Sequence, residues 1–152
     1  MSTARPAAAV SLPLTFTVHG RAVPQGSKRH LGRGILVESS DVKPWREAIT
    51  WAAREHIRPG PPHDGPIALQ LTFHRARPRS HYRTGANAHL TRPSAPDWPA
   101  TRPDLDKLAR AVLDALTGHI WRDDAQIVHL HAAKTWTTGS ARLDITITEA
   151  PP

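Results

Sequence analysis

The sequence contains no cysteine among its 152 residues, which excludes disulfide bonds and any zinc site built on thiolates. No apolar run approaches the ~20 residues that a membrane-spanning helix needs. The start, MSTARPAAAVSLPL, lacks the long apolar core of a secretory signal peptide. We therefore expect a cytoplasmic protein with no membrane partner. Residues 1–152 are expected to form a single domain, because a chain of this length can bury a core without cross-links.

Acidic residues are few relative to basic ones. The chain has 13 Asp and Glu against 20 Lys and Arg, which gives a formal net charge of +7 and a pI near 11.0. Such a balance favours a polyanionic partner, most often nucleic acid. The alternative is a basic composition without a specific role, because the whole chain is rich in Arg, Pro and Ala.

Hydrophobic patterns predict an α+β fold. Alternation of apolar and polar residues predicts strands at 14–20, 35–38, 67–73, 125–136 and 141–148. Apolar residues at helical spacing predict helices at 39–57 and 104–116. Residues 21–34 contain three glycines and several basic residues, and indicate a basic loop or hairpin tip. This order predicts a mixed sheet with two main helices packed on it.

A long segment at about 74–102 has no periodic pattern. It contains arginines at 75, 77, 79, 83, 92 and 102, whereas Asp97 is its single acidic residue, and prolines interrupt it. It is too long for an ordinary connection, so we expect it to be either functional or disordered. Its arginines stay hydrated unless a partner neutralises them.

Four aspartates flank the helix at 104–116. Asp104 and Asp106 stand at its start in RPDLDKLARAVLDAL, and Asp123 and Asp124 follow it. If Asp124 lies near the first pair, three carboxylates converge. At an effective dielectric of ~20, two such charges ~4 Å apart repel by ~4 kcal/mol, which a hard cation such as Mg²⁺ would offset. The alternatives are a helix cap for one of the first pair and a solvated turn for the second.

Two cations follow the first aspartate pair at helical spacing. Lys107 comes three residues after Asp104, and Arg110 comes four residues after Asp106. Both spacings place a cation beside a carboxylate on one helix face. They indicate either ordinary salt bridges of a few tenths of a kcal/mol or cations that hold a phosphate beside a metal.

These motifs resemble the RusA family of Holliday-junction resolvases, which occurs in phages and prophages. RPDLDKLARAVLDALTG followed by WRDDAQIV carries the resemblance, together with GRAVPQGSKR and ARLDITITE. It implies a RusA-like endonuclease domain with a basic insert at about 74–102. It further implies an intertwined homodimer that uses Mg²⁺, with Mn²⁺ as a substitute and no small-molecule cofactor, to cut four-way DNA junctions.

The resemblance also assigns roles to residues. Asp104, Asp106 and Asp124 match the family's catalytic, metal-binding carboxylates, and Asp123 matches an accessory neighbour. Arg110 stands where the family usually has a functional lysine, and Lys107 where it usually has asparagine. Arg110 can therefore supply positive charge but cannot donate a proton near neutral pH.

The expected reaction is metal-assisted hydrolysis of a phosphodiester. Two symmetric nicks would resolve the junction during DNA recombination and repair, which suits a two-fold dimer. We expect the DNA backbone to be held by seven basic residues: Lys28, Arg29, Arg75, Arg77, Arg79, Lys107 and Lys134.

Two other functions remain open at this point. A non-catalytic protein that binds DNA junctions would need the basic residues equally, although unneutralised carboxylates would repel phosphate. A phosphotransferase with a D-x-D motif would place that motif straight after an apolar strand, whereas ATRP precedes it here.

Overall fold

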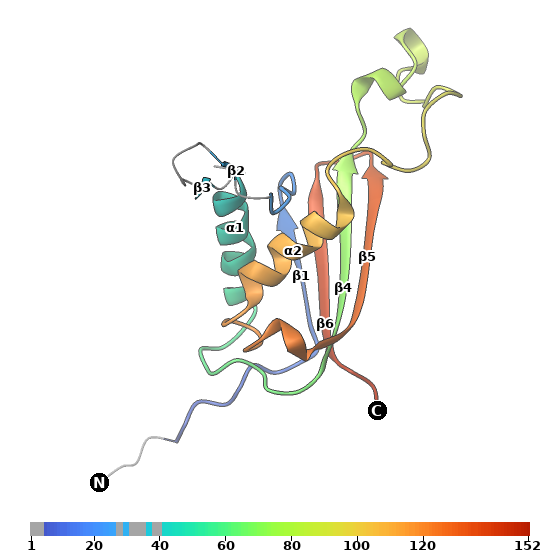
Figure 1. Cartoon of the computed structure of the whole chain (residues 1–152). Coiled ribbons are helices and arrows are strands. Elements are labelled where there is room, and N and C mark those ends of the chain that lie inside the picture. Colours follow the sequence, from blue (N-terminus) through green and yellow to red (C-terminus); the bar gives the residue numbers. More distant parts are fainter. Residues whose placement is uncertain (1–4, 27–28, 31–35, 38–40) are drawn as a thin grey trace.

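The computed structural model describes residues 5–26, 29–30, 36–37 and 41–152. The chain forms a four-stranded sheet with two helices on one face (Figure 1). The spatial order is β1-β6-β4-β5, for the strands β1 (Leu14–His19), β4 (Ile67–Ala76), β5 (Ile127–Thr137) and β6 (Arg142–Glu149). The predicted α+β class, the mixed sheet and its two main helices are thus confirmed.

Strand direction determines where the ends of the chain segments lie. Strand β6 pairs antiparallel with β1 and with β4, whereas β4 and β5 pair parallel. A parallel pair needs a crossover connection, usually a helix, and α2 (Leu105–Leu116) supplies it. The chain therefore leaves the end of β4, returns along the sheet in α2, and enters β5 at the opposite end.

The two helices follow the predicted pattern with small shifts at their ends. α1 (Val42–Arg54) is shorter than the predicted 39–57, and α2 begins one residue after Asp104. Gly118 follows α2 with φ of 85°, the left-handed conformation in which glycine commonly ends a helix. Neither helix is long and apolar enough to span a bilayer, nor is any other in the described residues.

The core lies between the sheet and the helices. Alternate residues of β1, β4 and β6 are buried on the helix side, as the period-2 pattern predicts. α2 buries Leu108, Val112 and Leu116 completely against them. β5 is an edge strand, and its Val128 and Leu130 are 55% and 49% exposed.

The basic segment after β1 contains a small hairpin. β2 (Arg29–His30) and β3 (Leu36–Val37) pair antiparallel, as the predicted hairpin tip requires. Lys28, one of the predicted DNA contacts, lies outside the described residues.

The segment between β4 and α2 projects beyond the end of the sheet (Figure 1). We call residues 77–100 the arm. It contains two short 3-10 turns, η1 (Arg79–His81) and η2 (Gly85–Asn87), and an antiparallel bridge between Tyr82 and Thr91. The arm is therefore a folded extension in which backbone groups pair with each other.

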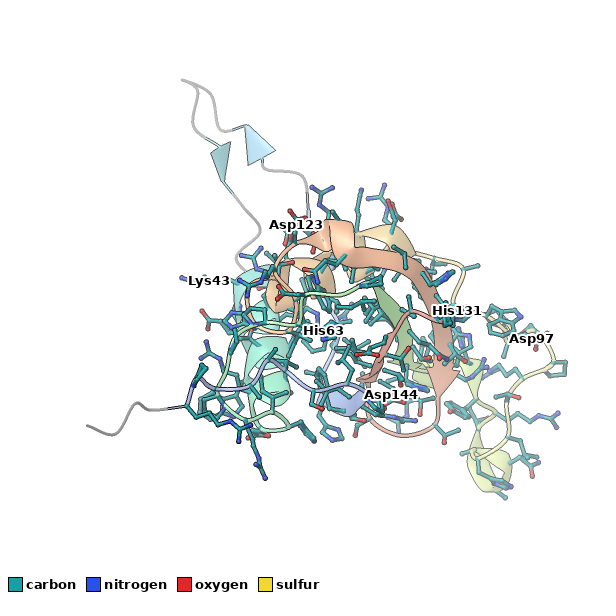
Figure 2. The ribbon with its side chains drawn as sticks, turned by 90° about the horizontal axis from the view of Figure 1, so that it is seen from below. Lys43, His63, Asp97, Asp123, His131 and Asp144 are labelled. Atoms are coloured by element: carbon teal, nitrogen blue, oxygen red, sulfur yellow. The ribbon has the colours of Figure 1, made fainter. Side chains whose placement is uncertain are left out.

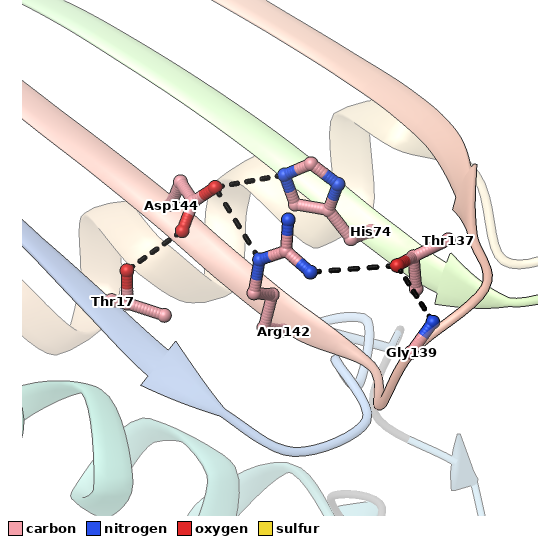
Figure 3. Close-up of polar contacts among 6 residues, drawn as sticks. All are labelled: Thr17, His74, Thr137, Gly139, Arg142 and Asp144. Atoms are coloured by element: carbon pink, nitrogen blue, oxygen red, sulfur yellow. Dashed lines mark hydrogen bonds and ion pairs between the residues drawn. The ribbon is translucent and has the colours of Figure 1, made fainter.

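The sheet face opposite the helices carries a polar cluster around Asp144 (Figure 3). Thr17 Oγ1 donates to Asp144 Oδ1 over 2.7 Å, and His74 Nε2 donates to Oδ2 over 2.8 Å. Arg142 Nε lies 3.6 Å from Oδ2. Burial disfavours the ionised carboxyl, but the hydrogen bonds from Thr17 and His74 and the charges of His74 and Arg142 outweigh it, so the pKa of Asp144 is lowered.

Candidate functional site

The start of α2 presents the first aspartate pair to solvent. Asp104 is the N-cap residue, but its side chain accepts no capping hydrogen bond. Its Oδ2 instead lies 3.5 Å from Lys107 Nζ, as the spacing predicted. Asp106 lies in the first turn, where the helix dipole favours a negative charge. Asp104 therefore occupies the N-cap position, as the helix-cap alternative expected, but its carboxylate does not cap the helix.

Two neighbouring clefts meet at Lys107. The first, which we call the Asp104 cleft, has a volume of about 580 Å³ and is also lined by Arg21 and Arg102. The second, the Asp106 cleft, has a volume of about 820 Å³ and is also lined by Arg110 and Asp124. Gly26 and Lys107 line both, so the two clefts adjoin along one surface.

Asp106 and Arg110 stand out because no described residue pairs with their side chains. Among the described residues, neither side chain has a hydrogen bond or an ion pair, although both line the Asp106 cleft. Their i, i+4 spacing puts them on one helix face, as predicted, without forming a contact between them. An exposed carboxylate and an exposed guanidinium in one cleft are available to a cation and an anion from solution.

Asp124 reaches the same cleft from the other end of the crossover. It begins η3 (Asp124–Gln126), the turn that leads into β5. Its Oδ1 accepts a hydrogen bond from Thr117, and Trp121 Nε1 lies 3.1 Å from the same oxygen. Trp121 is fully buried, so its indole N–H is a fixed donor. Oδ2 has no partner among the described residues and is free to act as a ligand.

The predicted convergence of three carboxylates is not found. Within the described ranges, no group of three or more histidine, aspartate or glutamate side chains is arranged to hold a metal ion. Asp106 and Asp124 line one cleft, whereas Asp104 lines its neighbour. The physical reason is that Lys107 lies between the clefts and pairs with Asp104.

Asp123, predicted as an accessory to the site, caps η3. Its Oδ1 accepts from Ala125 N over 2.8 Å, and its own N–H donates to Gln126 Oε1 over 3.0 Å. Gln126 Nε2 in turn donates to the carbonyl of His63 over 2.8 Å. These bonds stabilise the turn that contains Asp124, so Asp123 has a structural role in this turn.

The segment after β1 forms the facing wall of both clefts. Gln25 N donates to the carbonyl of Lys107 over 3.0 Å, which ties this segment to α2. Arg46 of α1 donates to Gln25 Oε1 over 2.6 Å. The wall is thus attached to both helices.

The other predicted DNA contacts differ in their availability. Arg79 is exposed, and its side chain has no partner in the described part of the chain. Arg75 is half-buried, and burial together with the charge of Arg21 lowers its pKa. Arg77 lies over the ring of Trp136 at 5.3 Å. Arg29 belongs to β2.

Lys134 holds the backbone that precedes Asp104. Its Nζ donates to the carbonyls of Thr101 and Pro103, each over 2.9 Å. Lys134 therefore links β5 to the entry of α2. Its predicted contact with DNA stays a prediction, since this ammonium already serves two protein acceptors.

Sequence reasoning missed several residues of the site. Thr117 and Trp121, which hold Asp124, were not singled out, and neither was Asp114, which lines the Asp106 cleft. Asp114 could have been found, because residues 106, 110 and 114 follow each other at four-residue spacing. The partners of Asp124 depend on how the chain turns after α2, which no local pattern predicts.

Comparison with known proteins identifies the family. The family described as Endodeoxyribonuclease RusA matches residues 19–148. An uncharacterized protein of Bacillus subtilis, YqaN, is 30% identical over 144 residues, covering 90% of this chain and 96% of that protein. The crossover junction endodeoxyribonucleases RusA of Escherichia coli K12 and of Enterobacteria phage 82 are each 49% identical over 49 residues, covering 32% of this chain and 41% of the relative. The chain belongs to the RusA family of endodeoxyribonucleases.

Proposed function

We propose that this protein is a divalent-metal-dependent endonuclease that resolves four-way DNA junctions. The observation that carries the proposal is the Asp106 cleft, where Asp106 and Arg110 lack protein partners in the described chain and Asp124 has one free oxygen. Membership in the RusA family supports DNA as the substrate. The E. coli relative is a crossover junction endodeoxyribonuclease, which supports a junction in particular.

The donor atoms of the Asp106 cleft suit a hard cation. Carboxylate oxygens are the ligands that Mg²⁺ takes in proteins, and it commonly uses one or two of them together with waters and a substrate phosphate. Asp106 and Asp124 would hold such an ion, with Mn²⁺ as a substitute. When bound, the ion would polarise the scissile phosphate and lower the pKa of a bound water.

Other residues of the clefts would act on the DNA directly. Arg110 can hold a non-bridging phosphate oxygen and stabilise the charge that develops during hydrolysis. Its role is to supply charge and bidentate hydrogen bonds to the phosphate, and we do not propose it as a general acid. Lys107, between the clefts, extends the positive surface towards Arg102 and Arg21.

Asp104 has a different place in this proposal. It lies in the adjoining cleft beside Lys107, so it does not contribute to the ion in the arrangement described. It becomes a ligand only if Lys107 exchanges its carboxylate for a DNA phosphate. We propose this exchange as the step that completes a set of three aspartates, Asp104, Asp106 and Asp124.

A junction has two strands that must be cut. Two symmetric nicks require two sites related by a two-fold axis, so we propose that residues 1–152 form one endonuclease domain that works as a homodimer. The two nicks would serve DNA recombination and repair.

The central test is cleavage of a synthetic four-way junction. With Mg²⁺, we expect the parent protein to cut the junction and to leave linear duplex of the same sequence intact. Asp106→Asn should reduce cleavage by more than the ~10–100-fold typical of removing a group that only supports a metal ligand. Junction affinity measured in EDTA should be equal to that of the parent or higher, because the amide keeps the size of the side chain and removes a charge that repels phosphate when no metal neutralises it.

The same assay addresses the non-catalytic alternative. A junction-binding protein without activity would bind the junction in EDTA and leave it intact when Mg²⁺ or Mn²⁺ is added. That result, or an Asp106→Asn variant that cuts at the parent rate, would contradict the proposed function.

A further inference from the structure

Arg77 and His81 attach the arm to the sheet. Arg77 N donates to the carbonyl of Thr137 over 3.2 Å, and Arg77 Nη1 donates to the carbonyl of Pro96 over 2.9 Å. Its guanidinium carbon lies 5.3 Å from the centroid of the Trp136 ring, and His81 packs edge-on against the same ring at 5.2 Å. Arg77 therefore joins both ends of the arm to β5, and its predicted contact with DNA stays a prediction.

The two sides of the arm are held together by backbone and side-chain bonds. Arg83 N donates to the carbonyl of Leu90, and Arg92 N donates to the carbonyl of His81, both over 2.8 Å. Arg83 Nε donates to the carbonyl of Thr91 over 3.1 Å, and Arg92 Nε donates to the carbonyl of Tyr82 over 2.8 Å. Each of these two guanidinium groups is thus anchored at Nε, whereas its terminal nitrogens have no partner among the described residues.

The surface of the arm is basic and carries an exposed indole. Arg79, Arg83 and Arg92 are all exposed, and Asp97 is the one acidic residue between positions 77 and 100. Asp97 lies in the projecting part of the chain, far from Asp123 (Figure 2). Trp98 is 65% exposed. Aromatic side chains beside exposed arginines are the combination with which proteins hold unpaired nucleotides.

We propose that the arm is a second DNA-binding surface, which holds the strands where they cross, while the Asp106 cleft acts on the phosphodiester. This inference rests on the proposed function. Arg79, Arg83 and Arg92 would contact phosphates, and Trp98 would stack on a base exposed at the crossing. Bases inside continuous duplex are stacked on each other, so this contact favours a junction.

Charge argues for DNA over a second copy of this chain as the occupant. A second copy also carries a formal net charge of +7, so it would meet the arginines with like charge, whereas DNA offers one negative charge per ~1.7 Å of helix axis.

The arm leads directly into the cleavage site. Residues 101–103 connect the arm to Asp104, and Lys134 holds their backbone through Thr101 and Pro103. Arg102 lines the Asp104 cleft beside Lys107. A strand bound by the arm can therefore continue over a basic path into the clefts.

The test measures binding separately from cleavage. All affinities are measured by fluorescence anisotropy in EDTA, for a labelled four-way junction and for duplex. The variant Arg79→Gln/Arg83→Gln/Arg92→Gln removes three charges but keeps polar side chains. We expect its junction affinity to fall by about 10–100-fold, with a salt dependence shallower by about 0.9 for each lost phosphate contact.

The matched control is Arg58→Gln. Arg58 is also exposed and has no partner in the described chain. It precedes the start of β4, whereas the arm follows the end of β4, so the control lies at the other end of the sheet. Its junction affinity should equal that of the parent.

Trp98→Ala tests the stacking contact. We expect it to weaken junction binding about 10-fold with little change for duplex, and Trp98→Phe should restore most of the loss. The side chain of Trp98 has no hydrogen bond or ring contact among the described residues, so circular dichroism and melting temperature should match the parent.

Three outcomes separate this inference from the proposed function. Unchanged junction affinity in the triple arginine variant overturns the inference even when cleavage continues. A loss of dimerisation in that variant, measured by light scattering, makes the arm a contact between copies and also overturns it. Arm-dependent junction binding by a parent protein that never cuts supports the inference and contradicts the proposed nuclease.

Discussion

The Asp106 cleft and the Asp144 cluster contain similar side chains but satisfy them differently. On the sheet face opposite the helices, Asp144 receives hydrogen bonds from Thr17 and His74 and lies near Arg142 (Figure 3). In the cleft, Asp106 and Arg110 lie on one helix face without any partner in the described chain. The Asp144 cluster therefore stabilises the sheet, whereas the cleft leaves its charges for a ligand.

Asp124 lies between these two cases. One of its oxygens is held by Thr117 and Trp121, and the other is free among the described residues. A carboxylate held in this way keeps a defined orientation and still offers a ligand atom. The comparison teaches that the number of protein partners of a charge, more than its residue type, distinguishes the structural positions of this protein from those that we propose to be functional.

After Asp106, the largest effect in this comparison should come from Arg110. Arg110→Ala should lower junction cleavage by ~100-fold, the loss expected when one group that stabilises the transition-state charge is removed. Arg110→Lys should retain activity within ~10-fold of the parent, because it keeps the charge but loses the bidentate geometry. Cleavage is measured in single turnover at saturating protein.

The melting temperature of the two Arg110 variants serves as the control for their folding. Its guanidinium is exposed and contacts no described residue, so neither variant should change the melting temperature. Full cleavage activity in Arg110→Ala would remove Arg110 from the mechanism and weaken the distinction between partnered and unpartnered charges.

An intermediate effect is expected at Trp121. Trp121→Phe removes the indole N–H that fixes Asp124 and should lower cleavage by about 10-fold, as for other groups that orient a metal ligand. It should also destabilise the fold by about 1–3 kcal/mol, because Trp121 is fully buried and a smaller ring leaves a void. Thr117→Val, which removes only a hydroxyl, should lower cleavage with a smaller loss of stability.

Trp51→Phe provides a matched control for Trp121. The indole of Trp51 also donates to a carboxylate, Glu55, over 2.9 Å, but Trp51 is 68% exposed and lies on α1. This variant should leave both cleavage and stability unchanged. If Trp121→Phe cuts as fast as Trp51→Phe, the indole does not position Asp124.

The smallest effect should come from Asp144. Its folded-state pKa is lowered, so the stability it contributes is present above the unfolded value of ~3.9 and is lost as pH falls through the lower folded value. Asp144→Asn should therefore flatten the acid limb of the curve of melting temperature against pH. We expect at most about 1 kcal/mol, since the side chain is 40% exposed and solvent screens its interactions.

Cleavage should not change in Asp144→Asn, because the cluster lies on the sheet face opposite the helices. A loss of cleavage together with an unchanged melting curve would mean that this cluster also serves the reaction.

The positions of the charged residues along α2 were predicted from the sequence. The sequence spacing correctly linked Lys107 with Asp104 and placed Asp106 beside Arg110, because residues three and four apart on a helix are neighbours. It did not predict that Lys107 would separate Asp104 from the Asp106 cleft. That outcome depends on the wall at Gln25, which the chain brings to α2 from a distant segment.

Prediction from the sequence had the same limit for the arm. Its arginines were recognised from composition, and their exposure was expected. However, equal charges at Arg77 and Arg79 have different surroundings, since Arg77 packs on Trp136 from β5 whereas Arg79 is free of described partners. Trp136 is 59 positions away in the chain, so composition alone could not distinguish the two.

The sequence by itself determined the strands, the two helices and the aspartate motif around α2, because these depend on periodicity and on spacing within one helix. Only the tertiary structure decided which charges have partners, how Asp124 is held and which arginines remain exposed. The physical reason is that a hydrogen bond or ion pair forms between segments that the fold brings together, whatever their distance along the chain.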